Sequence, residues 1–425
     1  MTRLHSLLVY FLLATLTVGA QGLKTVRPDK QGFSAERLAR IDSMLAGFTG
    51  AGHKVAGAAV VVLRNGNIVY HTASGYRNIE KGELLQKDDI FRIASQTKAV
   101  TATAVMMLYE EGKIALDDPV SRFIPEFARP KVMKAFDKAD TSYIAEPASR
   151  EITIRDLLTH TSGISYAVIG AADHNAIYAK NGIPIGFEPK LIRLADKMKA
   201  LGRLPLVHNP GERYTYGLSI DVLGYVVEIV SGLSLNQFFR QRIFEPLGMK
   251  DTYFYLPREK QGRLVTNYTV DKTGATIPRP EDTLLDHSYP LVENGTYYSG
   301  GAGLSSTVYD YALFMQMLLN GGELNGKRIL SPHTVRLLTG DQRPDQIPWT
   351  GVNSIGFCVE VVTEKGSYQL PWHKGTFVTG GFWGTHAWAD PTSQLVVVVM
   401  GQHSTWTWGE MLNKLKAVVY GALME

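Results

Sequence analysis

Ser95 and Lys98 are the residues of this chain whose types and spacing most clearly suggest chemistry. They form the motif Ser95-Gln96-Thr97-Lys98 at the start of a long apolar helical pattern. A spacing of three residues places the hydroxyl and the amine one turn apart on the same helix face. Apolar surroundings and the positive end of the helix dipole both disfavour an ammonium there, so a neutral lysine can accept the serine proton. The motif predicts an activated nucleophile; the alternative is an ordinary helix start with a capping serine and a solvated lysine.

A second candidate, Tyr216, lies in a turn-like segment just before an amphipathic helix pattern. The segment reads Pro210-Gly211-Glu212-Arg213-Tyr214-Thr215-Tyr216-Gly217-Leu218-Ser219. A phenol on such a turn can share the base role with Lys98 and return a proton to the leaving group. The alternatives are that Tyr214 has this role, or that Tyr216 only packs over the start of the helix.

Two adjacent glycines, Gly380 and Gly381, interrupt a strand pattern in residues 378–391. Glycine within a strand often marks the close approach of a ligand or of another backbone segment. If a substrate lies against this strand, the backbone N–H groups of Phe382 and Ser95 form the oxyanion hole that acyl transfer requires. The alternative is a β-bulge or a tight packing corner.

Five motifs follow one another along the chain. They are Ser95-Gln96-Thr97-Lys98, Leu158-Thr159-His160-Thr161-Ser162-Gly163, Pro210-Gly211-Glu212 with Tyr216, Gly300-Gly301-Ala302-Gly303-Leu304 and the Gly380-Gly381 strand. In this order they resemble serine hydrolases of the class C β-lactamase type, a superfamily of β-lactamases, D-alanyl peptidases, family VIII carboxylesterases and related acyltransferases. The resemblance covers about residues 33–422. It implies an α+β fold of the β-lactamase/transpeptidase type and an acyl-serine mechanism with Ser95 as nucleophile, Lys98 as base and Tyr216 as catalytic tyrosine.

Two departures from the class C pattern bear on the substrate. Those enzymes carry an asparagine where this chain has Leu218, and a Lys-Thr-Gly strand motif where this chain has Thr379-Gly380-Gly381. Lys374 matches the lysine of that motif only if the gap in the comparison with the class C enzymes is placed differently. Losing an amide contact and a carboxylate-binding lysine argues against efficient penicillin hydrolysis, whereas a neutral rim of Leu218, Phe382 and Trp383 suits uncharged esters.

We therefore expect an enzyme, a serine hydrolase of the esterase branch that cleaves small carboxylic esters through an acyl-enzyme on Ser95. The near alternative is a β-lactamase, or a D-alanyl-D-alanine carboxypeptidase or acyltransferase. The distant alternative is a non-catalytic cell-wall-binding or sensor protein, which has no need of Ser95, Lys98 and Tyr216 together. We expect no metal and no organic cofactor, since the 11 histidines show no metal-ligand spacing. The expected partner is a small ester or acyl substrate.

The patterns along the chain alternate between strand-like and helical segments. Strand patterns lie at 55–63, at 68–71 after an Asn65-Gly66 turn, and within 354–400. Helical patterns lie at 33–49, 97–111, 154–158, 191–200, 220–230, 235–243 and 410–420. We predict an antiparallel sheet flanked by helices, built from about 33–112 and 286–425, with a mainly helical lobe inserted at about 113–285. The cleft between the two lobes is the expected binding site.

Composition excludes several other classes of protein. With 425 residues, 45% of them hydrophobic, the chain can bury a large core. A net charge of +4, without a basic run interleaved with aromatic residues, argues against a nucleic-acid surface. The single cysteine, Cys358, excludes an internal disulfide and a cysteine-based zinc cluster. It lies in a strand-like pattern, so a buried structural thiol is expected.

The first residues resemble a secretory signal. Met1-Thr2-Arg3-Leu4-His5 precedes an almost wholly apolar run at 6–17, and Val18-Gly19-Ala20 has the small residues of a cleavage site. We expect residues 1–20 to be a cleaved signal peptide and residues 21–425 to form an exported, periplasmic or secreted domain without a stable membrane span. A membrane or lipid anchor is the alternative, but the apolar run is short for a bilayer.

Overall fold

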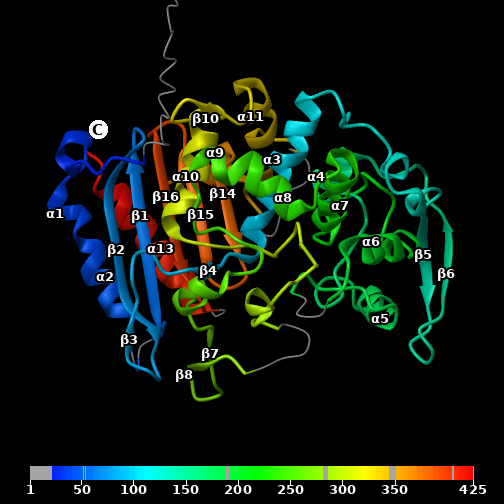
Figure 1. The fold of residues 1–425 in the computed structure, drawn as a ribbon, viewed down its shortest axis with the longest axis horizontal. Coiled ribbons are helices and arrows are strands. Elements are labelled where there is room, and N and C mark those ends of the chain that lie inside the picture. The colour runs from blue at the N-terminus through cyan, green and yellow to red at the C-terminus, as the bar shows by residue number, and fades with distance from the viewer. Residues whose placement is uncertain are drawn as a thin grey trace, which may run out of the picture.

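An antiparallel sheet of eight strands forms the centre of the computed structural model (Figure 1). The structure describes residues 22–50, 52, 54–187, 191–280, 286–343, 351–403 and 406–424. The order across the sheet is β12 (Ser354–Ile355), β13 (Glu360–Val361), β14 (Phe377–Gly381), β15 (Thr385–Asp390), β16 (Leu395–Gly401), β1 (Gly57–Arg64), β2 (Asn67–Asn78) and β3 (Glu83–Leu84). Strands from the two ends of the chain therefore lie side by side, which confirms the predicted fold class.

The two central strands, β1 and β16, are apolar and almost completely buried. They pair from Ala58 with Gly401 to Arg64 with Leu395. β1 turns into β2 through the predicted Asn-Gly pair at positions 65 and 66, whose φ angles of 49° and 74° fit a tight hairpin turn. Turn chemistry and burial on both faces thus fix the register of the sheet centre.

Helices cover both faces of the sheet. Alternate side chains of β1 point to opposite faces, so Val60 and Val62 pack with α2 and α13, while Val61 and Leu63 pack with α3 and α10. The helices are α1 (Ala35–Leu38), α2 (Arg40–Phe48), α3 (Thr97–Glu110), α4 (Ile154–Leu158), α5 (Ala172–Lys180), α6 (Leu194–Gly202), α7 (Ser219–Ser231), α8 (Leu235–Phe239), α9 (Glu245–Leu247), α10 (Val308–Leu319), α11 (Pro332–Thr339), α12 (Glu364–Ser367) and α13 (Trp406–Gly421). α3 therefore lies between the sheet and the helices that follow it.

The segment between α3 and α10 contains α4 to α9; of these, α4 to α7 lie on the side of the molecule away from α1 and α2, whereas α9 lies beside α10 (Figure 1). It also carries two small hairpins that the sequence patterns did not predict. These hairpins pair β5 (Lys131–Phe136) with β6 (Tyr143–Pro147), and β7 (Tyr268–Val270) with β8 (Thr276–Pro278). Two further short pairs are β4 (Phe91–Arg92) with β9 (Ser305–Ser306), and β10 (Glu323–Leu324) with β11 (Lys327–Arg328) after α10. One hydrophobic core joins this segment to the sheet, so the predicted lobe boundaries stay a prediction.

Two local predictions have different outcomes. The helix expected at 235–243 is confirmed, and it consists of α8 followed by a π-helical turn at Arg240–Phe244. The strand expected at Cys358 is wrong. Cys358 lies in a bend between β12 and β13, not in a strand, and its φ is 63°. Its backbone N–H donates to the carbonyl oxygen of Leu158 at 3.1 Å. That contact with a distant helix end takes the backbone of Cys358 out of the strand ladder.

The predicted signal peptide, residues 1–20, lies outside the described residues. Within the ranges that the structure does describe, no single helix has the length and apolar character needed to cross a bilayer. Ser219–Ser231 and Leu235–Leu247 meet that requirement only as a pair, with a 79° bend between them.

Candidate active site

Ser95 lies in the sharp turn that leads from β4 into α3. Residues Ala94–Gln96 form one 3-10 turn, and Ala94 has a φ of 42°, a left-handed conformation that is uncommon outside glycine. This turn leaves the Ser95 side chain partly exposed, whereas its neighbours are buried. Lys98, one turn later on α3, donates a hydrogen bond from Nζ to Ser95 Oγ at 3.1 Å. The structure thus brings the predicted hydroxyl and amine together.

Lys98 is 3% exposed, and three acceptors fix the position of its Nζ. Besides Ser95 Oγ, it donates to the carbonyl oxygen of Gly301 at 2.7 Å and to the phenol oxygen of Tyr166 at 3.1 Å. Nζ also lies 4.7 Å from the ring centroid of Tyr216. The amine is therefore enclosed by acceptors and aromatic faces, so it meets the nucleophile in a single orientation.

A buried carboxylate, Asp221, lies close to this amine. A side chain at Gly301 would contact the Asp221 carboxylate and lie 3.6 Å from Lys98 Nζ, so glycine lets the two groups approach each other. Burial raises the pKa of Asp221, whereas a hydrogen bond from Ser299 at 2.6 Å and the charge of Lys98 act in the opposite direction. Gly301 thus lets a buried carboxylate lie close to the Lys98 amine.

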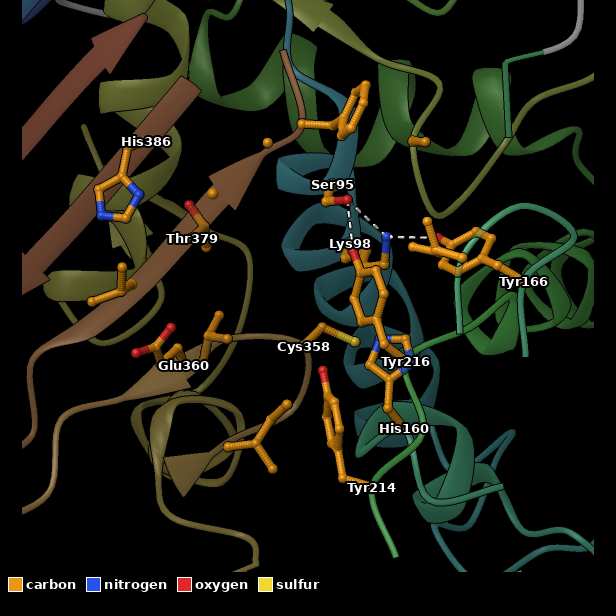
Figure 2. A pocket seen from close by; sticks show the side chains of 18 of the residues that line it. Ser95, Lys98, His160, Tyr166, Tyr214, Tyr216, Cys358, Glu360, Thr379 and His386 are labelled. Carbon is orange, nitrogen blue, oxygen red and sulfur yellow. Dashed lines mark hydrogen bonds between the residues drawn. The ribbon is translucent and has the colours of Figure 1, made fainter. Parts of the chain in front are cut away.

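Tyr216 donates a hydrogen bond from its phenol to Ser95 Oγ at 2.6 Å (Figure 2). Its loop is tied to the segment after α4, because the Thr215 N–H donates to the carbonyl oxygen of His160 at 2.7 Å. Gly217 packs so closely on the same segment that a side chain there would collide with its backbone. The His160 ring lies 4.8 Å from the Tyr216 ring, measured between centroids. Backbone pairing and ring packing therefore aim this phenol at the nucleophile.

Tyr214, the alternative catalytic tyrosine, lines the same pocket beside Cys358 (Figure 2). Burial raises the pKa of Tyr214 well above its usual value, so it stays a neutral phenol. The hydrogen bond to the nucleophile that the structure shows belongs to Tyr216. Cys358 is partly exposed to this pocket, but burial raises the pKa of its thiol to about 12, so a reactive thiolate is not favoured at neutral pH.

The predicted glycine strand, β14, runs beside the nucleophile turn. A side chain at Gly381 would collide with the carbonyl oxygen of Ile93 and with the Thr385 hydroxyl, so this position requires glycine. Phe382, the next residue, lines the pocket and is 47% exposed. Among the described residues, its N–H has no backbone acceptor. β14 thus brings Phe382 to the pocket that contains Ser95, and the oxyanion hole stays a prediction.

The predicted rim needs a correction. Leu218 and Trp383 are both completely buried, and neither lines the pocket. Leu218 is the first residue of the turn into α7 and packs in the core. The Trp383 ring lies 5.1 Å from the ring of Phe187 and 4.8 Å from that of Phe382, measured between centroids. The apolar wall instead comes from other segments, namely Val168, Ile169, Ile185, Phe187, Ala302, Ile355, Val359, Val378 and Phe382.

The pocket has a volume of about 480 Å³ and contains Ser95 at one side. Lys98 is the single lysine or arginine among its lining residues in the described part of the chain. Lys374, the alternative cation, has a side chain that is 68% exposed and pairs with Glu364 at 3.3 Å outside the pocket. On β14, Thr379 occupies the position that corresponds to the lysine of the Lys-Thr-Gly motif. No group of three His, Cys, Asp or Glu side chains suited to a metal occurs in the described ranges.

Several pocket residues were not predicted from the sequence. Tyr166 accepts a hydrogen bond from Lys98, and His160 packs on Tyr216. Burial and the charge of Lys98 lower the pKa of His160 well below its usual value, so its imidazole is neutral at pH 7. The motif at 158–163 contains His160 and directly precedes Tyr166, and was the available signal. Glu360 and His386 also line the pocket, and no sequence pattern marked them.

Comparisons with known proteins find relatives over most of the chain. The family model described as Beta-lactamase matches residues 40–419. Protein Rv1367c of Mycobacterium tuberculosis is 36% identical over 364 residues, covering 82% of this chain and 86% of that protein. Esterase EstB of Burkholderia gladioli is 32% identical over 345 residues, covering 79% and 82%. The solved structure of EstCE1, described as a hydrolase with promiscuous acyltransferase activity, superposes with a TM-score of 0.76 at 29% identity, covering 91% of this chain and 99% of that one.

Proposed function

Because this chain belongs to the beta-lactamase family, we propose that it is a serine hydrolase of the family VIII carboxylesterase type that cleaves small esters. The observation that carries the proposal is that Ser95 Oγ contacts two proton-transfer groups, Tyr216 OH at 2.6 Å and Lys98 Nζ at 3.1 Å. The similarity to Esterase EstB and to the hydrolase EstCE1 supports the same reaction class.

In the first step, Ser95 Oγ attacks the ester carbonyl carbon while Lys98, acting as the general base, accepts the serine proton. The N–H groups of Ser95 and Phe382 stabilise the oxyanion. The carbon–oxygen bond to the leaving alcohol then breaks, and the phenol of Tyr216 gives its proton to the departing oxygen. The proton on Lys98 restores the phenol, which leaves an acyl-enzyme on Ser95.

In the second step, water attacks the acyl carbonyl, and Lys98 with Tyr216 takes its proton. Collapse of the second tetrahedral intermediate releases the carboxylic acid and returns the proton to Ser95 Oγ. An alcohol in place of water gives acyl transfer by the same proton path. The lysine and the tyrosine therefore serve both half-reactions.

The pocket supports a neutral ester as the substrate. Its wall near Ser95 is aliphatic and aromatic, and Lys98, the one lysine or arginine among the described lining residues, is occupied by hydrogen bonds inside the site. A penicillin carries a carboxylate that needs a cationic partner. Thr379 stands on β14 and Lys374 lies outside the pocket, so the described residues supply no second lysine or arginine to the pocket that could bind such a carboxylate.

Three substrates, offered to the purified chain, test this proposal: p-nitrophenyl butyrate, a chromogenic cephalosporin and a D-alanyl-D-alanine peptide. We expect ester hydrolysis to exceed the other two reactions, and Ser95→Ala to lower its kcat/KM by at least about 1,000-fold. Ser142→Ala, at an exposed serine between β5 and β6, is the matched control and should retain the wild-type rate. A faster cephalosporin or peptide reaction, or a phosphonate adduct on a serine other than Ser95, would contradict the proposal.

We also propose that the chain is exported, on the basis of the apolar run and small-residue site in residues 1–20. Expression of the full chain with a C-terminal tag, followed by fractionation and N-terminal sequencing, tests this. A mature protein that begins at or near Gln21 in the periplasm or medium is the expected result. An uncleaved chain in the cytoplasm would contradict it.

A further inference from the structure

A second group of polar side chains lies in the pocket, on the side away from the nucleophile. Figure 2 shows Glu360, Thr379 and His386 beside the strands of the sheet, whereas Ser95 and Lys98 lie beside α3. The hydroxyl of Thr379 is already occupied, since it contacts the side chains of Gln96 and Tyr311 at 3.2 Å each. The proposed hydrolysis gives no role to Glu360 or His386.

Strand register explains how these two side chains reach the pocket. Glu360 on β13 pairs with Val378, and His386 on β15 pairs with Gly380, on either side of β14. Positions 378 and 380 share one face of the strand, so Glu360 and His386 point to that same face. Gly380 is exposed and carries no side chain that would cover them. We call the space over Gly380, between Glu360 and His386, the β14 notch.

Gly380 keeps the β14 notch open. Its φ does not lie in the left-handed range, so the backbone there does not itself require glycine. A Cβ at this position would lie 3.3 Å from Nδ1 of His386, closer than ordinary packing. The missing side chain therefore leaves Nδ1 accessible from the pocket, while Nε2 is buried and has no hydrogen-bond partner among the described residues.

The charges around the β14 notch favour hydrogen bonding. Burial and the charge of Lys416 lower the pKa of His386 well below its usual value, so its ring is neutral. Asn353 donates to Oε1 of Glu360, the one hydrogen bond to this carboxylate that the described residues provide. Burial raises the pKa of Glu360, whereas the hydrogen bond from Asn353 and the charge of Lys416 act in the opposite direction and favour the carboxylate. Lys416, on α13, is 6% exposed and lies 4.1 Å from the ring centroid of Trp372. The notch thus presents hydrogen-bond acceptors in an otherwise apolar pocket.

We propose that Glu360 and His386 form a subsite for a hydrogen-bond-donating substituent, a hydroxyl or an ammonium, at the far end of the substrate. The inference rests on the proposed ester hydrolysis and adds the substrate class. An alkyl chain between the ester and the donor group lies along the apolar wall, and the donor enters the β14 notch. A buried carboxylate with a free acceptor oxygen gains more from such a group than from a methyl end.

Matched ester series test the subsite. The first series comprises p-nitrophenyl esters of hexanoic, 6-hydroxyhexanoic and 6-aminohexanoic acids, and the second comprises butyrate esters of 1-hexanol, 1,6-hexanediol and 6-aminohexan-1-ol. In at least one series, we expect kcat/KM for a donor-bearing ester to exceed that of the alkyl ester about tenfold, mainly through KM. Glu360→Leu should abolish this preference. Glu360→Gln should weaken the preference for the ammonium ester more than that for the hydroxyl ester.

Two further variants guard against a folding artefact. Gly380→Ala, which narrows the β14 notch, should lower the preference about threefold or more through the lost hydrogen bond. Glu364→Gln removes an exposed carboxylate outside the pocket and should leave both preferences at wild-type values. If alkyl esters are hydrolysed in a Ser95-dependent way but neither series shows a preference, or Glu360→Leu keeps it, the subsite is wrong and the proposed function stands.

If no ester is hydrolysed, the proposed function fails, and binding then tests the subsite alone. Calorimetric titration with 6-aminohexan-1-ol compares its affinity for the Ser95→Ala variant with its affinity for the variant that also carries Glu360→Leu. Binding that depends on Glu360 would support the subsite. Equal or absent binding in both variants would overturn it.

Discussion

Replacing Tyr216 by phenylalanine removes one oxygen atom at the centre of the proposed mechanism. That oxygen donates to Ser95 Oγ at 2.6 Å. The ring itself is held by His160 at 4.8 Å and Tyr166 at 5.4 Å between centroids, and Lys98 Nζ lies 4.7 Å from its centroid. A phenylalanine ring keeps these packing contacts. The substitution therefore removes proton transfer while it leaves the shape of the pocket unchanged.

General acid–base catalysis by a positioned side chain contributes about 10²- to 10⁴-fold to rate, which corresponds to about 2.7–5.4 kcal/mol of activation free energy. We expect the kcat of Tyr216→Phe on p-nitrophenyl butyrate to decrease by a factor within that range, while KM and the thermal midpoint stay close to the wild-type values. Tyr214→Phe, in the same pocket, should cost less than about tenfold because Tyr214 transfers no proton in this mechanism. Retention of wild-type kcat in Tyr216→Phe, or an equal loss in Tyr214→Phe, would refute the assignment.

Three other substitutions probe the positioning of the site. Lys98→Met should lower kcat/KM by at least about 100-fold in the ester assay, because it removes the amine that contacts Ser95 Oγ and accepts its proton in the proposed mechanism. Gly381→Ala should lower both activity and the free energy of unfolding, by about 1–3 kcal/mol in urea titrations, because its side chain collides with the carbonyl oxygen of Ile93. Burial alone would raise the pKa of Asp156, but Arg150, bonded at 2.6 and 2.8 Å, helps to hold it below 3.8. A lowered native pKa stabilises the folded state above pH 3.8, and this stabilisation is lost as the pH falls through the native pKa. The free energy of unfolding of Asp156→Asn, measured by urea titration, should therefore decrease less with falling pH than that of the wild type.

The predictions from the sequence succeeded where the relevant geometry is local. Ser95 and Lys98 are three residues apart on one helix, and helical spacing alone brings their side chains together. The Asn-Gly pair at 65 and 66 similarly prescribes its own hairpin. The prediction about the rim failed because it depended on the direction of a side chain. Leu218 follows Tyr216 by two residues, yet the turn into α7 points the Leu218 side chain into the core.

The sequence by itself determined the fold class, the nucleophile motif and the order of the family motifs, because helix periodicity, strand alternation and turn chemistry are written in neighbouring residues. The tertiary structure alone decided which distant groups meet. Tyr166, Gly301 and Tyr216 come from three separate segments and converge on Lys98 and Ser95. The β14 notch likewise exists only because sheet register places side chains of β13 and β15 on one face. Contacts of this kind depend on packing between elements far apart in the chain, so local sequence patterns do not predict them.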